Sequence, residues 1–117
     1  MSDDDLDALL AALSNRTRRR MLDLLMAGPG QTLSALATHF DMSRIGVLKH
    51  VDVLEAAGLV HSHRAGRTRR LTADPTPLQL LLDRFSDRYS AFWSGHLANI
   101  KARVEESAAA ARDENRA

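Results

Sequence analysis

The feature that most constrains the fold is a pair of amphipathic helical patterns with almost nothing between them. Residues 33–40 and 43–58 each repeat apolar side chains at helical spacing, and only residues 41–42 separate them. Thr32 and Ser43 stand where the N-caps of two such helices are needed. Two short helices joined this tightly cannot lie antiparallel, so they must cross at a steep angle. The spacing therefore predicts a helix-turn-helix.

The second helix of this pair has an outward face unlike an ordinary solvated surface. Val47, Val51 and Leu54 fall on one stripe and are expected to point into the core. The opposite face carries bases beside bare aliphatic side chains, a mixture that suits a surface entering a groove of DNA. This face consists of Arg44, Ile45, Leu48, Lys49 and Asp52. We predict that this helix reads double-stranded DNA.

The first turn of this helix is the end that enters the major groove when a helix-turn-helix docks. Arg44 lies there and is expected to donate two hydrogen bonds to guanine, with a phosphate contact as the alternative. Lys49 lies further along the helix and is assigned to phosphate. Ser43 is expected to hold a phosphate in addition to capping the helix.

Three uncharged positions of the same helix each allow two interpretations. Ile45 and Leu48 are placed to press on thymine methyl groups, or they are exposed aliphatic side chains without a role. Gly46 costs about 1 kcal/mol in a helix relative to Ala, which close approach to a partner surface, or neutral drift, would explain. We include all three in the predicted DNA-binding surface.

A hairpin with a basic tip follows directly after these helices. Residues 59–63 and 69–73 are strand-like and flank a turn around Gly66. A hairpin in this position is typical of the wing of a winged helix-turn-helix. Its arginines suit the DNA backbone or a narrow minor groove, whereas the alternative is a solvated face without a partner. They are Arg64, Arg67, Arg69 and Arg70.

A long amphipathic helix is predicted from Thr76, as its cap, onward, and it carries most of the aromatic residues of the chain. About 30 residues of helix span about 45 Å, which exceeds the ~26 Å diameter of a domain of this size. We therefore expect part of its apolar stripe to pair with a second copy of the chain, helped by the first helix, rather than to pack wholly on its own domain. The expected dimer interface comprises Leu6, Leu9, Leu10, Leu82, Phe85, Tyr89, Phe92, Trp93, His96, Leu97 and Ile100.

The predicted fold class is mainly α with a small β-hairpin wing, in the order of four helices, two strands and a last helix. The first two helices are expected around residues 6–13 and 16–26. Residues 1–106 are predicted to form one winged helix-turn-helix domain for DNA binding and dimerisation. Residues 107–117 are Ala-rich and charged, and are expected to be a frayed or disordered tail.

The formal net charge of +1 hides a strong segregation along the chain. Residues 1–13 hold four aspartates and no base, whereas residues 14–28 hold four arginines and one aspartate. Residues 43–70 hold six bases and two acids, so positive charge lies where a nucleic-acid surface would need it. Of the arginines within residues 16–20, one or two are expected to reach phosphate and the others to pair with the acidic first helix.

Several other classes of protein are disfavoured. Cysteine is absent, which excludes disulfides and thiolate metal sites. No arrangement of nucleophile and base and no phosphate-binding loop stands out, so neither an enzyme nor a cofactor is expected. His61 and His63 share one face of a strand but lack a third metal ligand. No apolar run approaches the ~20 residues of a membrane span and the start lacks a signal peptide, so we expect a cytoplasmic protein without membrane contact.

The motifs described above carry a family resemblance over about residues 6–104. They read LSNRTRRRMLDLL, LSALATHFDMSRIGVLKHVDVLEAAGLV and HRAGRTRRLTAD, followed by RYSAFWSGHLANIKARVEE on the last helix. The chain resembles the ArsR family of bacterial winged-helix repressors, in the branch without cysteines. The resemblance implies a dimeric operator-binding repressor with the first and last helices at the interface, and DNA-facing positions at Ser43, Arg44, Lys49 and the wing arginines.

Two departures from the family limit what the resemblance implies. The thiolate and the paired acidic and His ligand sets of metal-sensing members are absent, so a metal is not expected. Leu48 stands where relatives usually have a small residue, so base preference cannot be transferred.

The sequence as a whole predicts a homodimeric transcriptional repressor. Two copies of the reading helix, about one duplex turn (~34 Å) apart, would occupy successive major grooves of an inverted repeat. A protein-binding winged helix whose exposed aliphatic side chains contact a partner is the alternative, as is a repressor with an unrecognised effector. Tyr89, Trp93 and His96 could line an apolar effector pocket, or they could belong to a plain dimer interface. The sequence fits both interpretations equally well.

Overall fold

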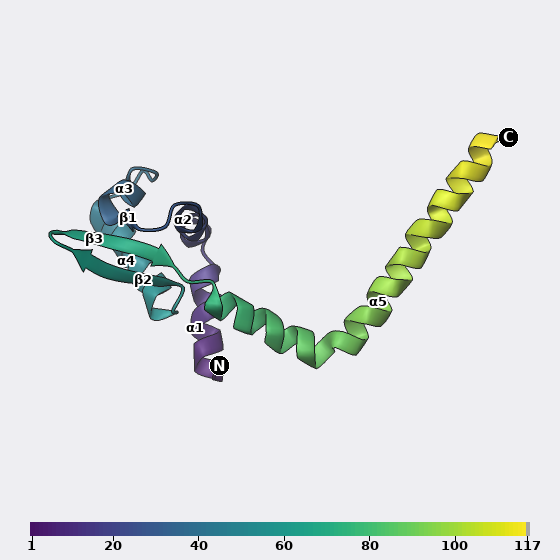
Figure 1. The fold of residues 1–117 in the computed structure, drawn as a ribbon, viewed down its shortest axis with the longest axis horizontal. Coiled ribbons are helices and arrows are strands. Elements are labelled where there is room, and N and C mark those ends of the chain that lie inside the picture. The colour runs from purple at the N-terminus through teal and green to yellow at the C-terminus, as the bar shows by residue number, and fades with distance from the viewer. Residues whose placement is uncertain (117) are drawn as a thin grey trace. The chain divides into compact units, whose positions relative to one another are not determined.

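A computed structural model of the chain describes residues 1–116, apart from the side chains of residues 91, 93, 115 and 116. Trp93, one of the predicted interface residues, therefore has a side chain outside the described residues. The elements, shown in Figure 1, are α1 (Asp3–Leu13), α2 (Arg16–Ala27), β1 (Gln31–Thr32), α3 (Leu33–Ala37), α4 (Arg44–Ala56), β2 (Val60–Ala65), β3 (Thr68–Ala73) and α5 (Thr76–Arg116). Among the described residues, no helix combines the length and the apolar character needed to cross a membrane.

The chain divides into two compact units, Met1–Leu81 and Leu82–Ala117. This division lies inside α5, and the predicted domain limit at residues 106 and 107 stays a prediction. Helix α5 continues to Arg116, through the segment for which fraying is expected, so that fraying stays a prediction. The helix also begins at Thr76 itself, one residue earlier than expected, with the Thr76 N–H donating to Asp74 Oδ1 at 2.9 Å.

Polar caps fix where the helices of the first unit begin. Ser2 and Asp5 form a reciprocal capping box at the start of α1. Asn15 caps α2 by accepting from the Arg18 N–H, and the Thr32 hydroxyl accepts from the N–H of Ala35 in α3. The predicted Ser43 cap is also formed, and its role is described with the site below.

The core of the first unit is built only from apolar side chains. Val47, Val51 and Leu54 are fully buried in it, as their stripe on α4 predicts. Leu9 is only 1% exposed, so it belongs to this core and cannot supply area to a dimer interface, which corrects the prediction for that residue. The core consists of Leu9, Ala12, Met21, Leu22, Leu25, Leu33, Leu36, Val47, Val51, Leu54, Leu59, Val60 and Leu71.

A tight turn leads the chain from α4 into the sheet. Gly58 has a φ of +76°, which places it in the left-handed region that favours glycine. Its N–H donates to the Glu55 carbonyl and the Leu59 N–H donates to the Leu54 carbonyl, both at 3.0 Å. This pair of hydrogen bonds is a Schellman motif, and the fully buried Leu54 and Leu59 are its apolar partners. The direction in which the hairpin leaves α4 is therefore set by Gly58.

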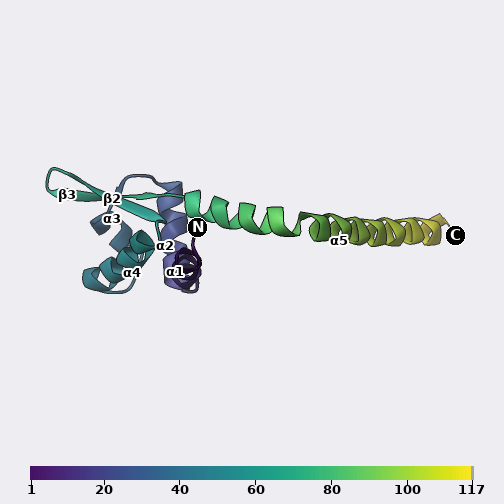
Figure 2. The same cartoon turned by 90° about the horizontal axis from the view of Figure 1, so that it is seen from below.

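The sheet has three antiparallel strands in the order β1-β3-β2. The β2–β3 hairpin was expected, and it turns at Gly66, which has a φ of +67°. The third strand, β1, was not predicted because it consists only of Gln31 and Thr32, which pair with Leu71 and Arg70 of β3. The hairpin extends past α3 and α4 as a free loop in both views (Figure 1, Figure 2).

Candidate nucleic-acid interface

The first turn of α4 is open to solvent. The Ser43 hydroxyl accepts a hydrogen bond from the Gly46 N–H at 3.0 Å and so starts the helix. Ile45 is 68% exposed, and Arg44 and Lys49 are exposed beside it. The turn thus presents a bare aliphatic side chain to solvent beside two bases.

Leu48 of α4 differs from the outward orientation that was predicted for it. Leu48 is half-buried and packs against the core, because it lies at the margin of the apolar stripe. It therefore offers only part of its side chain to a partner. Gly46 is also half-buried, and a Cβ added there would lie 3.3 Å from Ser43 Oγ.

A hollow of about 290 Å³ lies between the start of α3, the start of α4 and the tip of the hairpin. Arg44 of α4 and Arg67 of the hairpin turn line the same hollow, although 23 positions separate them in the sequence. The complete lining is Thr32, Leu33, Ser34, Arg44, Arg67, Thr68 and Arg69. The structure thus brings together residues that the sequence assigned to separate contacts.

Arg69 is held by α4, although the sequence predicted it to face DNA. Its Nη2 donates to Glu55 Oε2 at 3.0 Å and to Ser62 Oγ at 3.1 Å, and it lies 3.9 Å from Asp52 Oδ1. Glu55 Oε1 also accepts from the hydroxyl of Ser62 at 2.7 Å and from its backbone N–H at 3.3 Å. These bonds fasten both strands of the hairpin to the helix.

The hydrogen bonds of Ser62, followed by the positive charge of Arg69, lower the pKa of Glu55 below 4.5. Glu55 was not identified from the sequence, because its partners lie 7 and 14 residues further along the chain.

The other arginines of the hairpin are exposed. Arg70 Nη1 donates to the Gly30 carbonyl at 2.9 Å, which ties β3 to the segment before β1. Arg64 and Arg67 are exposed near the hairpin tip. Three of the four predicted wing arginines are thus exposed, whereas Arg69 is partly covered.

Two arginines of α2 bind backbone carbonyls at the end of α1. Arg18 Nε and Nη2 donate to the carbonyls of Ala12 and Ala11 at 2.8 and 3.0 Å, and Arg19 Nη1 donates to the Leu13 carbonyl at 2.9 Å. These carbonyls lie at the C-terminal end of α1, where positive charge is favourable. Arg18 Nη1 also contacts His50 Nδ1 at 3.2 Å. Part of the charge on α2 therefore stabilises the fold.

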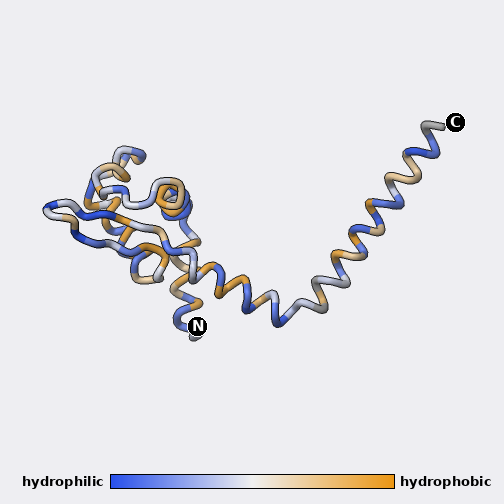
Figure 3. The backbone as a smooth tube through the Cα atoms, viewed as in Figure 1, coloured by the Kyte–Doolittle hydropathy of each residue, from blue (hydrophilic) through white to orange (hydrophobic). Residues whose placement is uncertain are grey.

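Helix α5 in the second unit exposes most of its large apolar residues. Hydrophobic and hydrophilic stretches alternate along it in Figure 3. Phe92 is 64% exposed and stacks on His96 at a ring-centroid distance of 5.8 Å, and Phe85 stacks on Tyr89 at 6.0 Å. The predicted interface residues exposed on this helix are Leu82, Phe85, Tyr89, Phe92, His96, Leu97 and Ile100. On α1, Leu10 is exposed and Leu6 is half-buried.

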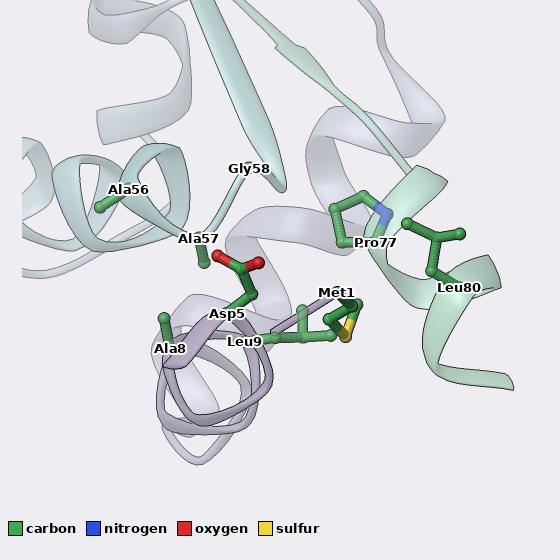
Figure 4. A pocket seen from close by; sticks show the side chains of 9 residues that line it. All are labelled: Met1, Asp5, Ala8, Leu9, Ala56, Ala57, Gly58, Pro77 and Leu80. Atoms are coloured by element: carbon green, nitrogen blue, oxygen red, sulfur yellow. The ribbon is translucent and has the colours of Figure 1, made fainter. Parts of the chain in front are cut away.

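A pocket of about 350 Å³ lies in the first unit where α1, the end of α4 and the first turns of α5 meet (Figure 4). Asp5 is the only acidic residue that lines it, among otherwise apolar side chains and Gly58. On α5 this pocket is lined by Pro77 and Leu80. It is therefore different from the apolar pocket that the sequence suggested around Tyr89 and His96.

One histidine of the hairpin is paired with an acidic residue. His61 Nε2 lies 2.8 Å from Asp74 Oδ2. The Thr76 side chain and backbone, followed by His61, lower the pKa of Asp74 to about 2. No group of three or more His, Cys, Asp or Glu residues suited to a metal ion occurs within the part of the chain that the structure describes.

Comparisons with known proteins agree with this arrangement. A family model described as a helix-turn-helix domain matches residues 13–63. The chain is 35% identical to the transcriptional repressor SdpR of Bacillus subtilis, covering 58% of this chain and 74% of that protein.

Two solved structures are also similar to the chain. An ArsR-like transcriptional regulator from Rhodococcus sp. RHA1 is 37% identical, with a TM-score of 0.66 and coverage of 85% of this chain and 92% of that one. The homodimeric winged helix-turn-helix DNA-binding domain of a possible ArsR-family regulator from Mycobacterium bovis is 26% identical, with a TM-score of 0.60 and coverage of 76% and 90%.

Proposed function

Because the chain belongs to the ArsR family of winged-helix regulators, and is thus a DNA-binding transcriptional regulator, we propose that it is a homodimeric repressor of an inverted-repeat operator. The first turn of α4 enters the major groove, where Ile45 contacts the bases and Ser43 and Lys49 contact the backbone. The observation that carries this proposal is the exposed mixture of aliphatic and basic side chains on that turn. Such a regulator acts on the chromosome, so we expect it in the cytoplasm of its bacterial host.

The proposed dimer rests on the apolar side chains that α5 leaves exposed in the second unit. Their exposure is costly in water, and a second copy of the chain would bury them. The homodimeric relative from Mycobacterium bovis supports a dimer as the working form. Two copies of α4 about 34 Å apart would then match half-sites one helical turn apart.

The experiment that tests this function is a titration of labelled duplexes with the full chain, followed by fluorescence anisotropy. The duplexes come from the promoter of the chain's own gene and from a random library enriched by binding. Each contacted phosphate is expected to make the slope of log affinity against log salt more negative by about 0.9. A protein-binding winged helix with apolar contacts would bind no duplex even at low salt, and that result would overturn the proposal.

Dimerisation is tested separately by sedimentation of wild type and of Phe92→Ser. The variant removes an exposed aromatic side chain of the proposed interface and should shift the chain toward monomer. Arg112→Gln, an exposed position near the end of α5, is the matched control and should leave the dimer unchanged. A monomeric wild type at micromolar concentration would contradict the dimer without contradicting DNA binding.

A further inference from the structure

The hollow between α4 and the hairpin is the part of the surface whose role the proposed function does not yet assign. It is bordered by three elements, namely the start of α3, the start of α4 and the tip of the hairpin. Arg44, Arg67 and Arg69 all line it, and no carboxylate does. Its volume of about 290 Å³ is roughly ten times the ~30 Å³ that one water occupies in the liquid. The hollow therefore combines positive charge with room for a small anionic group.

The two arginines at the rim are available for a ligand. Within the described residues, the side chains of Arg44 and Arg67 make no hydrogen bond or ion pair with the rest of the chain. Arg69 differs, because its Nη2 is bound by Glu55 and Ser62. That bond orients the guanidinium of Arg69 as part of the wall, and Leu33, only 6% exposed, connects the lining to the core. A guanidinium fork is the side chain best suited to phosphate oxygens.

The geometry of DNA decides which anion faces this hollow. In a duplex, one sugar-phosphate strand separates the major groove from the neighbouring minor groove. If α4 lies in the major groove and the hairpin reaches the flanking minor groove, that strand must pass between them. The hollow lies between the same two elements, so it faces phosphates and not base edges.

We propose that this hollow seats a single phosphate of the DNA backbone, bound from α4 by Arg44 and from the wing by Arg67. The proposal rests on the proposed function, and it assigns Arg44 to phosphate and not to guanine. Shared binding of one phosphate fixes the wing and the reading helix in a single register on the duplex. Arg44 then contributes to the affinity for DNA, and base preference comes from other residues of α4.

The test compares Arg44→Gln, Arg67→Gln and the double variant on the best-binding duplex from the enriched library. Each single variant should weaken binding about 10-fold, as expected for the loss of a charge-assisted hydrogen bond. The double variant should lose much less than the product of the two effects, because both side chains hold the same phosphate. The binding of duplexes with single base changes should keep the same rank order in Arg44→Gln as in wild type.

A second arm locates the phosphate in the DNA. Uncharged methylphosphonate linkages, placed one at a time along each strand, should weaken wild type at every contacted phosphate, and one of these positions in each half-site should be the phosphate seated in the hollow. The linkage at that phosphate should have little further effect on either single variant. Arg112→Gln serves as the charge-matched control, and it should behave as wild type.

The outcomes separate this proposal from the function on which it rests. A change of base preference at one position in Arg44→Gln, or fully multiplicative losses in the double variant, overturns the shared phosphate while DNA binding stands. Failure of wild type to bind any duplex at low salt overturns the proposed function itself. The side chains of Arg44 and Arg67 are exposed and have no partners among the described residues. The variants should therefore unfold at the same temperature as wild type.

Discussion

Replacing Glu55 by Ala should loosen the connection between the reading helix and the wing. Its carboxylate accepts three hydrogen bonds, from the Ser62 hydroxyl, the Ser62 N–H and Arg69 Nη2, at 2.7, 3.3 and 3.0 Å. Hydrogen bonds to a charged group contribute about 1.5–3 kcal/mol each where water is excluded. The side chains of Glu55 and Arg69 are each 34% exposed, so solvent screens much of this interaction. We expect a total loss of about 1–2 kcal/mol, after discounting for that screening.

The assay is urea unfolding of the full chain at one fixed concentration, because a dimer would make stability depend on concentration. Glu55→Ala, Arg69→Ala and the double variant form a cycle whose coupling free energy should be about 0.5–1 kcal/mol. Lys101 and Glu105 provide the control pair, since they are 3.9 Å apart with side chains 79% and 67% exposed. Their coupling should be near zero.

The Glu55 carboxylate also predicts that the free energy of unfolding depends on pH. The pKa of Glu55 in the folded chain lies below its ordinary value of 4.5. Its contribution to stability is therefore complete above pH 4.5 and is lost as the pH falls through the lowered folded pKa. Glu55→Gln removes this contribution, so the difference in unfolding free energy between wild type and variant should shrink as the pH falls below 4.5. A constant difference, or a Glu55–Arg69 coupling no larger than that of the control pair, would refute the reasoning.

Three further substitutions test other local features, each by urea unfolding. Gly58→Ala should destabilise the fold by about 1–2 kcal/mol, because Gly58 holds the left-handed conformation that ends α4, whereas Gly95→Ala in α5 should not destabilise it. Gly46→Ala should gain less stability than the about 1 kcal/mol of helix propensity, because its Cβ would lie 3.3 Å from the capping Ser43 Oγ, and it should weaken DNA binding in anisotropy titrations; unchanged binding would show that α4 does not approach DNA closely there. Arg18→Ala should cost about 1–2 kcal/mol because α1 loses two carbonyl contacts, and a neutral result would argue against that capping role.

Features governed by short-range contacts were predictable from the sequence. The cap of α4 spans three residues, from Ser43 to Gly46, and the cap of α3 likewise spans Thr32 to Ala35. The buried stripe of α4 follows from helical periodicity alone. These local rules were sufficient to predict the helix-turn-helix and the hairpin that follows it.

Features that depend on contacts between distant residues were not predictable. Strand β1 exists only because it pairs with β3, about 40 residues further along the chain. Leu9 and Leu10 are equally apolar, and only the packing of the other helices decides that Leu9 is buried and Leu10 exposed. The sequence predicts that the arginines of α2 reach phosphate or pair with the aspartates of α1, whereas Arg18 and Arg19 bind backbone carbonyls at the end of α1. The DNA contacts and the interface residues stay predictions.

The register of β3 limits how the wing can change length during evolution. Leu71 is fully buried while its neighbour Arg70 is exposed, since successive side chains in a strand point to opposite faces. If the turn at Gly66 keeps its form, inserting one residue between Gly66 and Leu71 would exchange these two environments, placing a guanidinium in the core. Inserting two residues, one on each side of the turn, would lengthen the hairpin and preserve the alternation. Natural or engineered wings on this scaffold should therefore grow in steps of two.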